Sequence, residues 1–292
     1  MTQQTELRVL AGIPAYNEAS YVGSVVLLAR QYADEVIVVD DGSTDNTSRI
    51  AELAGATVIR HDENKGKGAA IQSLLAEAKK RNADVLVLLD ADSQHNPNEI
   101  PALVKPISEG FDLVIGSRKA QKNKTPRYRR IGQKVLLRST RILSKEGISD
   151  SECGFRALSP KAIDKLELKE RGFAVESEMI ACAADKNLKI TEVPISNIYT
   201  TDGSTLNPVK HGVGVLNRIM TMIAERRPLL FFGLVGGILL AAGLLTGIRV
   251  LNIAATEGVL AMGSAMLTVL LIITGILSIF TGIILDALIR RK

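Results

Sequence analysis

Two long stretches toward the C-terminus contain no charged residue, and they restrict the possible folds of this chain more than any other feature. They are PLLFFGLVGGILLAAGLLTGI (Pro228–Ile248) and GVLAMGSAMLTVLLIITGILSIFTGIIL (Gly258–Leu285). As helices, both reach the length of about 20 residues that a hydrocarbon layer requires. Two glycine-rich stretches in succession, joined by a short loop, favour membrane helices over the buried helices of a soluble domain. The sequence predicts a transmembrane hairpin over 228–292, with spans at about 229–249 and 259–286.

The charges around these stretches predict the orientation of the hairpin. Basic residues lie at both outer ends, whereas the connecting loop RVLNIAATE contains only Arg249. Because basic residues are enriched on the cytoplasmic side, we expect a multi-pass protein of the cell membrane with both termini in the cytoplasm. The N-terminal residues MTQQTELRVLAGIPAYNE lack the basic region and apolar core of a signal peptide, which agrees with this orientation. The flanking basic residues are Arg226, Arg227, Arg290, Arg291 and Lys292.

Two further expectations concern the neighbourhood of the hairpin. Segment 213–227 has an apolar helical face and predicts an amphipathic helix at the membrane surface, with packing on the preceding domain as the alternative. Small residues such as Gly236, Gly237 and Gly243 allow helices to approach closely, which leaves a homo-oligomer open. The apolar face of the amphipathic segment consists of Val215, Ile219, Met222 and Ile223.

Residues 1–212 alternate between apolar runs and helix-like stretches. This alternation predicts an α/β domain with a mostly parallel sheet flanked by helices. In such sheets ligands bind beyond the carboxyl ends of the strands, and the polar motifs of this chain follow the predicted strands. We expect strands at 7–15, 35–43, 57–62, 85–92 and 111–118, and helices at 18–32, 45–54, 67–81 and 96–108.

The charge balance narrows the class of partner. The chain of 292 residues has a formal net charge of +5, but aromatic residues make up 4% and tryptophan is absent. Nucleic-acid-binding surfaces often interleave basic and aromatic residues, so we expect phosphorylated substrates and a lipid surface rather than nucleic acid. The two cysteines, Cys153 and Cys182, lie far apart and outside any C-x-x-C motif, which indicates reduced thiols in a reducing compartment.

The stretch VLVLLDADSQH ends an aliphatic strand in two carboxylates, Asp90 and Asp92. Burying such charges without compensation is unfavourable. A divalent cation would compensate them, since Mg²⁺ and Mn²⁺ prefer oxygen ligands. Alternating residues of an extended segment point the same way, so Asp90, Asp92 and Gln94 could converge on one ion. We expect His95 to pack behind this site rather than to bind the metal.

Two other motifs permit more than one interpretation. Asp40 and Asp41 end the strand in VIVVDDGSTD, where carboxylates can accept hydrogen bonds from a ribose or a base. The stretch NKGKGAA opens a helix whose N–H groups would face a phosphate. A loop followed by an ordinary helix start explains NKGKGAA equally well.

Six motifs in order, IPAYNE, VVDDGSTDNT, NKGKGAA, LDADSQH, IGSR and CGFRALS, resemble the family 2 glycosyltransferases of the GT-A fold. The most similar members are the dolichyl-phosphate mannose synthases and related enzymes that act on polyprenyl phosphates. The resemblance covers about Leu7 to Lys210, and the two-span tail is similar to that of some members. It implies a GT-A domain over 1–212 that transfers a hexose from a UDP- or GDP-sugar to a polyprenyl or dolichyl phosphate, with Mg²⁺ or Mn²⁺, for protein or cell-surface glycosylation.

The resemblance also implies roles for individual residues. Asp92 and Gln94 would bind the metal, with Asp92 and Arg118 as catalytic residues. Arg118, Arg129 and Arg130 would contact the acceptor phosphate; a solvated basic face is the alternative for the last two. The donor would be bordered by Pro14, Tyr16, Glu18, Asp40, Asp41, Asp90 and Ala91.

One region departs from the family pattern. Many members have an arginine and then G-x-S-K-L after the strand EVPI, and the lysine contacts the diphosphate. This chain has EVPISNIYTTDGSTLNPVKHG, with Thr205 at the position of the lysine. Lys210 or His211 would then replace it as a donor contact.

The resemblance implies inversion at the anomeric carbon, because the acceptor phosphate attacks in line. Three alternatives remain at this point. A processive polysaccharide synthase would show Q-x-x-R-W and more spans, a nucleotidyltransferase would show a basic glycine-rich first loop, and this chain has none of these features. A non-catalytic, membrane-tethered scaffold would bind the sugar nucleotide without turnover.

Overall fold

The computed structural model describes residues 7–118, 148, 150–172, 174–196, 220–221, 223–225, 227–258 and 261–290. The chain divides into two compact units, Met1–Ile219 and Met220–Lys292. The predicted amphipathic helix at 213–227 falls mainly outside the described residues, as do Arg129, Arg130, Lys210 and His211.

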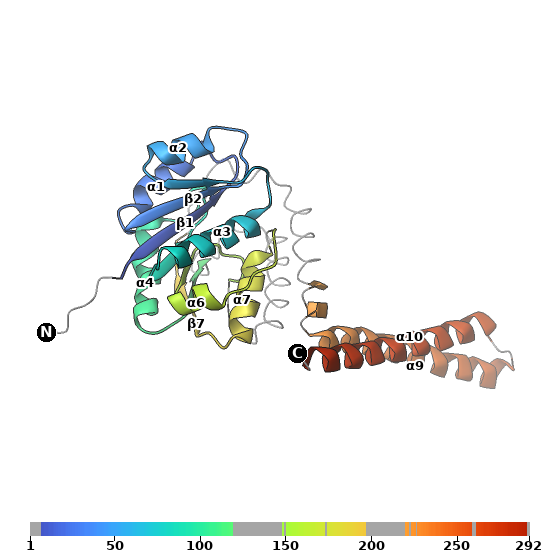
Figure 1. Cartoon of the computed structure of the whole chain (residues 1–292). Coiled ribbons are helices and arrows are strands. Elements are labelled where there is room, and N and C mark those ends of the chain that lie inside the picture. Colours follow the sequence, from blue (N-terminus) through green and yellow to red (C-terminus); the bar gives the residue numbers. More distant parts are fainter. Residues whose placement is uncertain are drawn as a thin grey trace. The chain divides into compact units, whose positions relative to one another are not determined.

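The first unit is built on one sheet, which in the described part of the chain has the strand order β3-β2-β1-β4-β6-β5-β7 (Figure 1). All neighbouring strands pair in parallel except β6, which runs antiparallel to both β4 and β5. The predicted mostly parallel α/β sheet is confirmed. The strands are β1 (Val9–Ala15), β2 (Glu35–Asp40), β3 (Thr57–Arg60), β4 (Val85–Leu88), β5 (Leu113–Ser117), β6 (Arg156–Leu158) and β7 (Ile190–Pro194).

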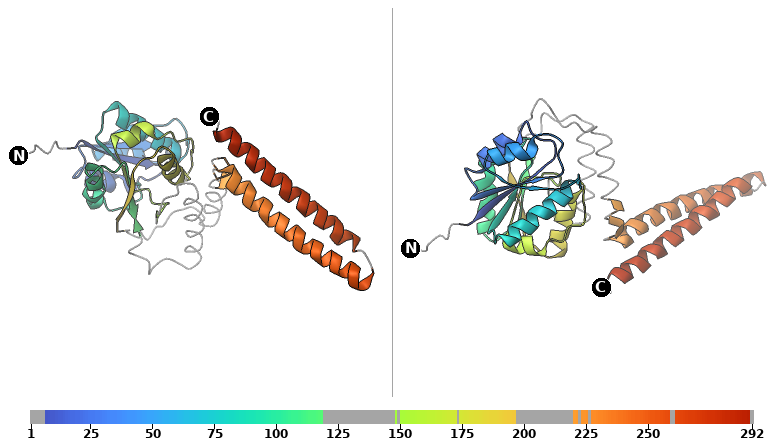
Figure 2. Two further views of the ribbon diagram at one scale, coloured as in Figure 1. Left: turned by 90° about the horizontal axis from the view of Figure 1, so that it is seen from below. Right: turned by 45° about the horizontal axis from the view of Figure 1, so that its top comes forward.

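Helices cover both faces of this sheet (Figure 2). Helices α1 and α4 lie on one face, and α3 and α6 lie together on the other. This arrangement explains why β4 and β5 are buried at every residue, because a strand covered on both faces needs a continuous apolar run. The helices are α1 (Val22–Ala29), α2 (Thr47–Leu53), α3 (Lys67–Lys80), η1 (Pro97–Glu99), α4 (Ile100–Ser108), α6 (Pro160–Lys165) and α7 (Val175–Asp185).

Several details differ from the expected elements, and helices α6 and α7 were not among the expected helices. Strand β4 ends at Leu88 rather than at Asp92, since the residues that follow form a turn in which Ser93 has a positive φ of 60°. Strand β6 was not expected, because three residues are too few to show a period in the sequence. Strand β6 pairs with β4 on one side and with β5 on the other. This pairing brings the CGFR motif next to the D-x-D segment.

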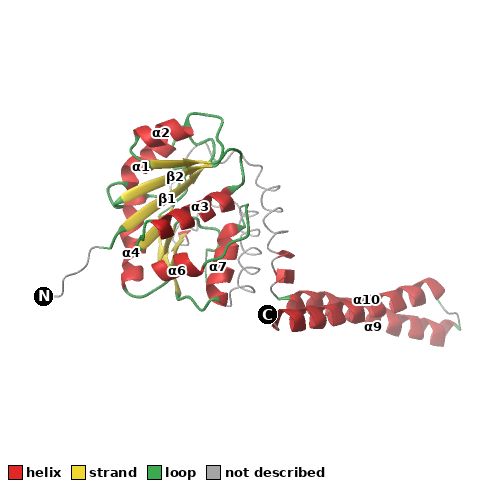
Figure 3. Ribbon diagram, viewed as in Figure 1, coloured by secondary structure: helices red, strands yellow, loops and turns green. Residues whose placement is uncertain are grey.

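The second unit consists mainly of two long apolar helices, α9 (Pro228–Glu257) and α10 (Met262–Arg290), which pack side by side (Figure 3). Glycines make the close approach possible: a Cβ on Gly236 would lie 2.6 Å from the carbonyl oxygen of Gly275. Two hydrogen bonds join the helices, from Thr268 Oγ1 to Thr246 Oγ1 at 3.0 Å and from Ser278 Oγ to Phe232 O at 2.9 Å.

The outer surface of this pair is apolar. Leucines and isoleucines such as Leu234, Leu245 and Ile273 are more than half exposed. Both helices are long and apolar enough to cross a membrane, with mean hydropathies of 2.3 and 2.5. Gly236 and Gly243, considered above for contacts between protomers, instead pack against α10 within the same chain, whereas Gly237 faces outward with no atom near its missing Cβ.

We predict that Gly275→Leu separates α9 from α10, because a Cβ there would lie 2.9 Å from Gly236 O. Cysteines introduced at Thr246 and Thr268, whose hydroxyls touch, report the packing by forming an oxidised peptide pair detectable by mass spectrometry. The disulfide yield should fall severalfold in Gly275→Leu. It should be retained in the matched variant Gly237→Leu, whose side chain enters open space. Equal yields in the two variants would contradict this packing.

Candidate functional site

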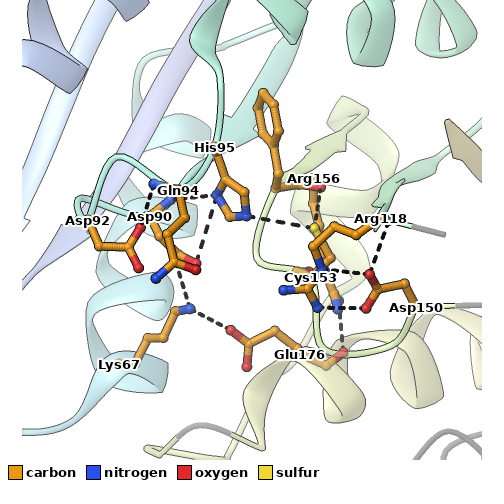
Figure 4. A network of polar contacts seen from close by, with 11 residues as sticks. Lys67, Asp90, Asp92, Gln94, His95, Arg118, Asp150, Cys153, Arg156 and Glu176 are labelled. Carbon is orange, nitrogen blue, oxygen red and sulfur yellow. Dashed lines mark hydrogen bonds and ion pairs between the residues drawn. The ribbon is translucent and has the colours of Figure 1, made fainter. Parts of the chain in front are cut away.

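The candidate site lies where β1, β2, β4 and β5 end, and its centre is the turn after β4. Figure 4 shows the side chains of Asp90 and Asp92 leaving this turn toward the same side. Asp92 accepts the backbone N–H of Gln94 at 3.0 Å. Residues from the α3 start, the segment before β6 and the α7 start complete the network drawn there.

The charge of Asp90 is compensated by a lysine that the sequence analysis did not single out. Lys67 Nζ lies 2.7 Å from Asp90 Oδ1 and 2.7 Å from Glu176 Oε1. Burial would lower the pKa of Lys67, but the two carboxylates outweigh burial and raise it. The same lysine holds the pKa of Asp90 well below its usual range, against the opposing effect of burial. Lys67 therefore stays charged, and Asp90 needs no metal ion to remain ionised.

Asp92 is in a different electrostatic environment. Burial, and then the charge of Asp90, raise the pKa of its carboxyl group above the ordinary value. The protein thus leaves the negative charge of Asp92 incompletely compensated, which is the condition that favours a bound cation. The described residues contain no group of three or more His, Cys, Asp or Glu arranged to hold a metal. Carboxylate oxygens such as those of Asp92 are ligands that Mg²⁺ prefers, and this ion usually takes one or two carboxylates and completes its shell with substrate phosphates and water.

Glu18, in the loop after β1, belongs to the same acidic environment. Burial raises the pKa of its carboxyl group to about 7, with further contributions from the charges of Asp92 and Asp90. A contact of 3.4 Å between the hydroxyls of Ser24 in α1 and Ser93 joins α1 to the acidic turn. Three carboxyl groups therefore share one region, and a cation there would lower their mutual repulsion.

Arg118, which directly follows β5, is held by Asp150. Its Nε and Nη2 donate to the two carboxylate oxygens of Asp150 at 2.7 and 2.8 Å. Asp150 is itself positioned by its backbone N–H, which donates to Glu192 Oε1 of β7 at 3.0 Å. Although burial would lower the pKa of Arg118, Asp150 raises it, so the guanidinium is a fixed positive charge beside the acidic turn.

Asp40 and Asp41 have their carboxylates turned into the protein. Asp40 accepts the N–H of Ser43 at 2.8 Å and the hydroxyl of Ser48. Asp41 interacts with His61 Nδ1 at 2.6 Å and accepts two backbone N–H groups of the NKGKG loop, from Lys65 at 3.0 Å and Gly66 at 2.7 Å. These contacts hold the first two loops in place, and the expected contact with a base or ribose stays a prediction.

The NKGKG motif is a helix start whose glycines allow backbone segments to touch. The N–H of Gly68 donates to Arg171 O at 2.7 Å, and a Cβ on Gly68 would lie 2.1 Å from Glu170 O. The N–H groups of Lys65, Gly66 and Gly68 are therefore used within the protein. Of the two interpretations given above, the loop with an ordinary helix start explains these three donors.

The CGFR motif touches the acidic turn directly. A Cβ on Gly154 would lie 2.7 Å from Asp90 Oδ2, so only glycine leaves room for this carboxylate. Arg156 is almost fully buried, and it donates to three backbone carbonyls, those of Ser151, Cys153 and Glu176, each at 2.8 Å. Arg156 thereby ties the segment before β6 to the start of α7, where Glu176 meets Lys67.

The remaining expected donor contacts are less closely grouped. Ala91 is buried within the turn, Pro14 is partly buried in β1, and Tyr16 is exposed beyond the end of that strand. Five charged residues of this region were not predicted from the sequence: Lys67, Asp150, Glu152, Arg156 and Glu176. Lys67 and Arg156 lie within the quoted motifs NKGKGAA and CGFRALS, but the ion pairs of Lys67 with Asp90 and Glu176 join residues far apart in the chain, which no local pattern indicates.

Comparison with known proteins agrees with this geometry. Residues 11–167, more than half of the chain, match the family described as Glycosyl transferase family 2. The chain belongs to glycosyl transferase family 2. It is a glycosyltransferase, and the resemblance drawn from six motifs is confirmed.

Within family 2, the chain is similar to proteins named for lipid-linked sugars. It is 36% identical to the UDP-N-acetylglucosamine–dolichyl-phosphate N-acetylglucosaminyltransferase of Methanococcus voltae, over 64% of this chain and 84% of that protein. It is 33% identical to the dolichol-phosphate mannosyltransferase of Pyrococcus furiosus, over 65% of this chain and 56% of that protein.

A solved structure shows the same fold at lower identity. Glucosyl-3-phosphoglycerate synthase from Mycobacterium tuberculosis, in complex with Mn²⁺, UDP and phosphoglyceric acid, superposes with a TM-score of 0.62 and 21% identity. The match covers 76% of this chain and 78% of that one. At this identity the match supports the GT-A-type fold of the family 2 domain.

We predict that Lys67→Met destabilises the protein by up to about 3 kcal/mol, because Asp90 and Glu176 would lose the cation between them. The matched control is Lys79→Met on the same helix, which removes an exposed ion pair with Asp164 and should change stability by less than about 1 kcal/mol. Denaturant unfolding of the full chain in detergent, followed by circular dichroism, measures both. Equal losses in the two variants would contradict the role of Lys67.

The neighbouring carboxyl group of Glu152 predicts a pH dependence. Burial, and then the charge of Glu176, raise its pKa to about 7 from an ordinary value of 4.5. The stability that the protonated group contributes is present below pH 4.5 and is lost as the pH rises through 7. Glu152→Gln cannot ionise, so its melting temperature relative to the original chain should be higher at pH 8 than at pH 5. A difference that does not change with pH would contradict this environment.

Proposed function

We propose that the protein transfers a hexose from a nucleoside-diphosphate sugar to a polyprenyl or dolichyl phosphate, with inversion and with a divalent cation. The proposal is based on one observation. A family 2 domain, in which the charge of Asp92 is incompletely compensated, occurs in the same chain as two long apolar helices. A substrate that remains in the bilayer requires an enzyme that is held there. The names of the two relatives above, both acting on dolichyl phosphate, support the same class of acceptor.

The donor is proposed as a UDP- or GDP-sugar. The relatives differ in the sugar that their names state, N-acetylglucosamine in one and mannose in the other. We assign donor contacts to residues of the acidic turn and of the ends of β1 and β2. These are Pro14, Tyr16, Glu18, Asp40, Asp41, Asp90 and Ala91, with Lys210 as a further candidate outside the described residues.

Asp92 and Gln94 would hold Mg²⁺ or Mn²⁺, in line with the Mn²⁺ named for the structural relative. When bound, the cation would offset the negative charge that develops on the departing nucleoside diphosphate. Arg118 would add a second, fixed positive charge on the other side of the turn. Because Asp150 grips two of its nitrogens, its guanidinium is preorganised and needs no reorientation during transfer.

The acceptor phosphate is already anionic at neutral pH, so it needs positioning rather than a strong general base. We assign this positioning to Arg118, with Arg129 and Arg130 as candidates outside the described residues. In-line attack on the anomeric carbon inverts its configuration. We further propose a GT-A domain over 1–212, an interfacial helix over 213–227 and a membrane hairpin over 228–292, with both termini in the cytoplasm.

The test incubates membranes containing the full chain with a panel of labelled UDP- and GDP-sugars, polyprenyl phosphate and Mg²⁺ or Mn²⁺. We expect label from one donor in the organic extract, and a loss of about 100-fold or more in Asp92→Ala. The control is Asp84→Ala at the opposite end of β4, where the carboxylate accepts the N–H of Arg8 at 2.9 Å; it should retain activity. Near-original product from Asp92→Ala would exclude the metal role, and donor binding without any lipid product would favour the non-catalytic scaffold.

A further inference from the structure

His95 lies buried behind the acidic turn, and both of its ring nitrogens have partners (Figure 4). Its Nδ1 lies 3.3 Å from the backbone nitrogen of Asp90, which donates to it. Its Nε2 lies 3.8 Å from Sγ of Cys153. The ring stacks on Phe155, with centroids 5.2 Å apart. His95 therefore connects the D-x-D turn to the CGFR segment.

These contacts determine where the protons lie. Nδ1 of His95 lies 3.3 Å from the backbone nitrogen of Asp90 and 3.8 Å from its carboxylate Oδ2, and only the first distance is that of a hydrogen bond. A backbone N–H can only donate, so Nδ1 accepts and carries no proton. The proton of the imidazole then lies on Nε2 and points at Cys153 Sγ. The thiol in turn has the carbonyl oxygen of Phe155 as its acceptor, at 4.0 Å. The hydrogen bonds thus run in one direction, from Asp90 N–H through His95 and Cys153 to Phe155.

The environment of the two side chains agrees with this direction. Burial raises the pKa of the Cys153 thiol to about 11. The charged groups that act on His95 are Asp90, Arg118, Lys67 and Asp150. The thiol of Cys153 therefore stays protonated near pH 7, and the imidazole of His95 is neutral because its Nδ1 accepts a hydrogen bond.

The turn needs such support because its backbone is strained. Ser93, between Asp92 and Gln94, has a φ of +60°. The other non-glycine residues with positive φ in the described part of the chain are all asparagines, which tolerate this region better than serine. Strained residues of this kind persist only where the surrounding contacts hold them. The hydrogen bonds from Asp90 N–H through His95 and Cys153, called the relay below, hold the turn from its buried side.

We propose that His95 and Cys153 are positioning residues that hold the backbone N–H of Asp90, and so set the directions in which Asp90 and Asp92 present their carboxylates. Neither residue touches substrate or cation. Groups that orient ligands from behind typically change metal affinity by about 10- to 100-fold when they are altered. The proposal rests on the proposed cation at Asp92, and the proton positions can be tested without it.

The first experiment measures the tautomer of His95 in the full chain in detergent, labelled with ¹⁵N-histidine. The chain has three histidines, so the ring signals can be assigned by substituting each one. We expect a protonated Nε2 and an unprotonated Nδ1 for His95. Cys153→Ala should shift the Nε2 signal, whereas Cys153→Ser, which retains an acceptor, should shift it less. A proton on Nδ1, or no response to Cys153→Ala, would overturn the relay whatever the protein catalyses.

The second experiment measures Mn²⁺ binding by electron paramagnetic resonance in the presence of UDP. We expect Cys153→Ala to weaken Mn²⁺ binding roughly tenfold, with partial rescue in Cys153→Ser. The matched control is Cys182→Ala, which truncates the other buried cysteine, on α7, whose Sγ faces Glu167 O at 3.9 Å. It should leave Mn²⁺ binding unchanged. If the two alanine variants weakened Mn²⁺ binding equally, the effect of Cys153→Ala would reflect packing in general, and the proposal would be overturned.

If the original chain binds Mn²⁺ and UDP but yields no lipid-linked sugar with any donor, the proposed function fails while the relay remains supported. If the tautomer is as expected but Mn²⁺ binding does not respond to Cys153→Ala, the relay exists without positioning the cation site, and the inference fails while the proposed function stands. The two failures are therefore distinguishable.

Discussion

The ammonium group of Lys67, held between the carboxylates of Asp90 and Glu176, is the interaction on which the site depends. Removing charged groups from water is unfavourable unless they are paired, and this lysine pairs two carboxylates at once. It lets one aspartate of the turn remain ionised without help from outside the protein. The charge of the other aspartate is only incompletely compensated. The two carboxylates of the D-x-D motif therefore have different chemistry, although they are two residues apart.

Several motifs that look independent along the chain support this one turn. Gly154 leaves room for Asp90, Arg156 fixes the segment that carries Asp150 and Cys153, and the glycines of NKGKG let α3 begin where Lys67 can reach. The short antiparallel strand β6 makes these contacts possible, because it places the CGFR segment between β4 and β5. The motifs NKGKGAA, LDADSQH and CGFRALS are thus parts of a single packing arrangement around the acidic turn.

The second unit packs differently from the domain that contains the site. Its two helices meet through glycines and hydroxyls, while large apolar side chains cover the outside. In water this surface would be unfavourable, whereas in a hydrocarbon layer it is the favoured one. A family 2 transferase domain and an apolar helix pair in one chain fit the proposed acceptor, which is itself a lipid.

The sequence by itself determined the alternating α/β domain, the two apolar helices, the family and the polar motifs at the strand ends, because these depend on local periodicity, on length and on ordered motifs. It also identified Asp90, Asp92 and Arg118 as neighbours in a shared region, since parallel strands end at the same edge of a sheet. Only the tertiary structure decided which group compensates each charge. Lys67 precedes Asp90 by 23 positions and Glu176 follows it by 86, and no local pattern encodes a pairing over such distances. For the same reason the antiparallel β6, the grip of Asp150 on Arg118 and the direction of the hydrogen bonds through His95 and Cys153 became visible only in the folded chain.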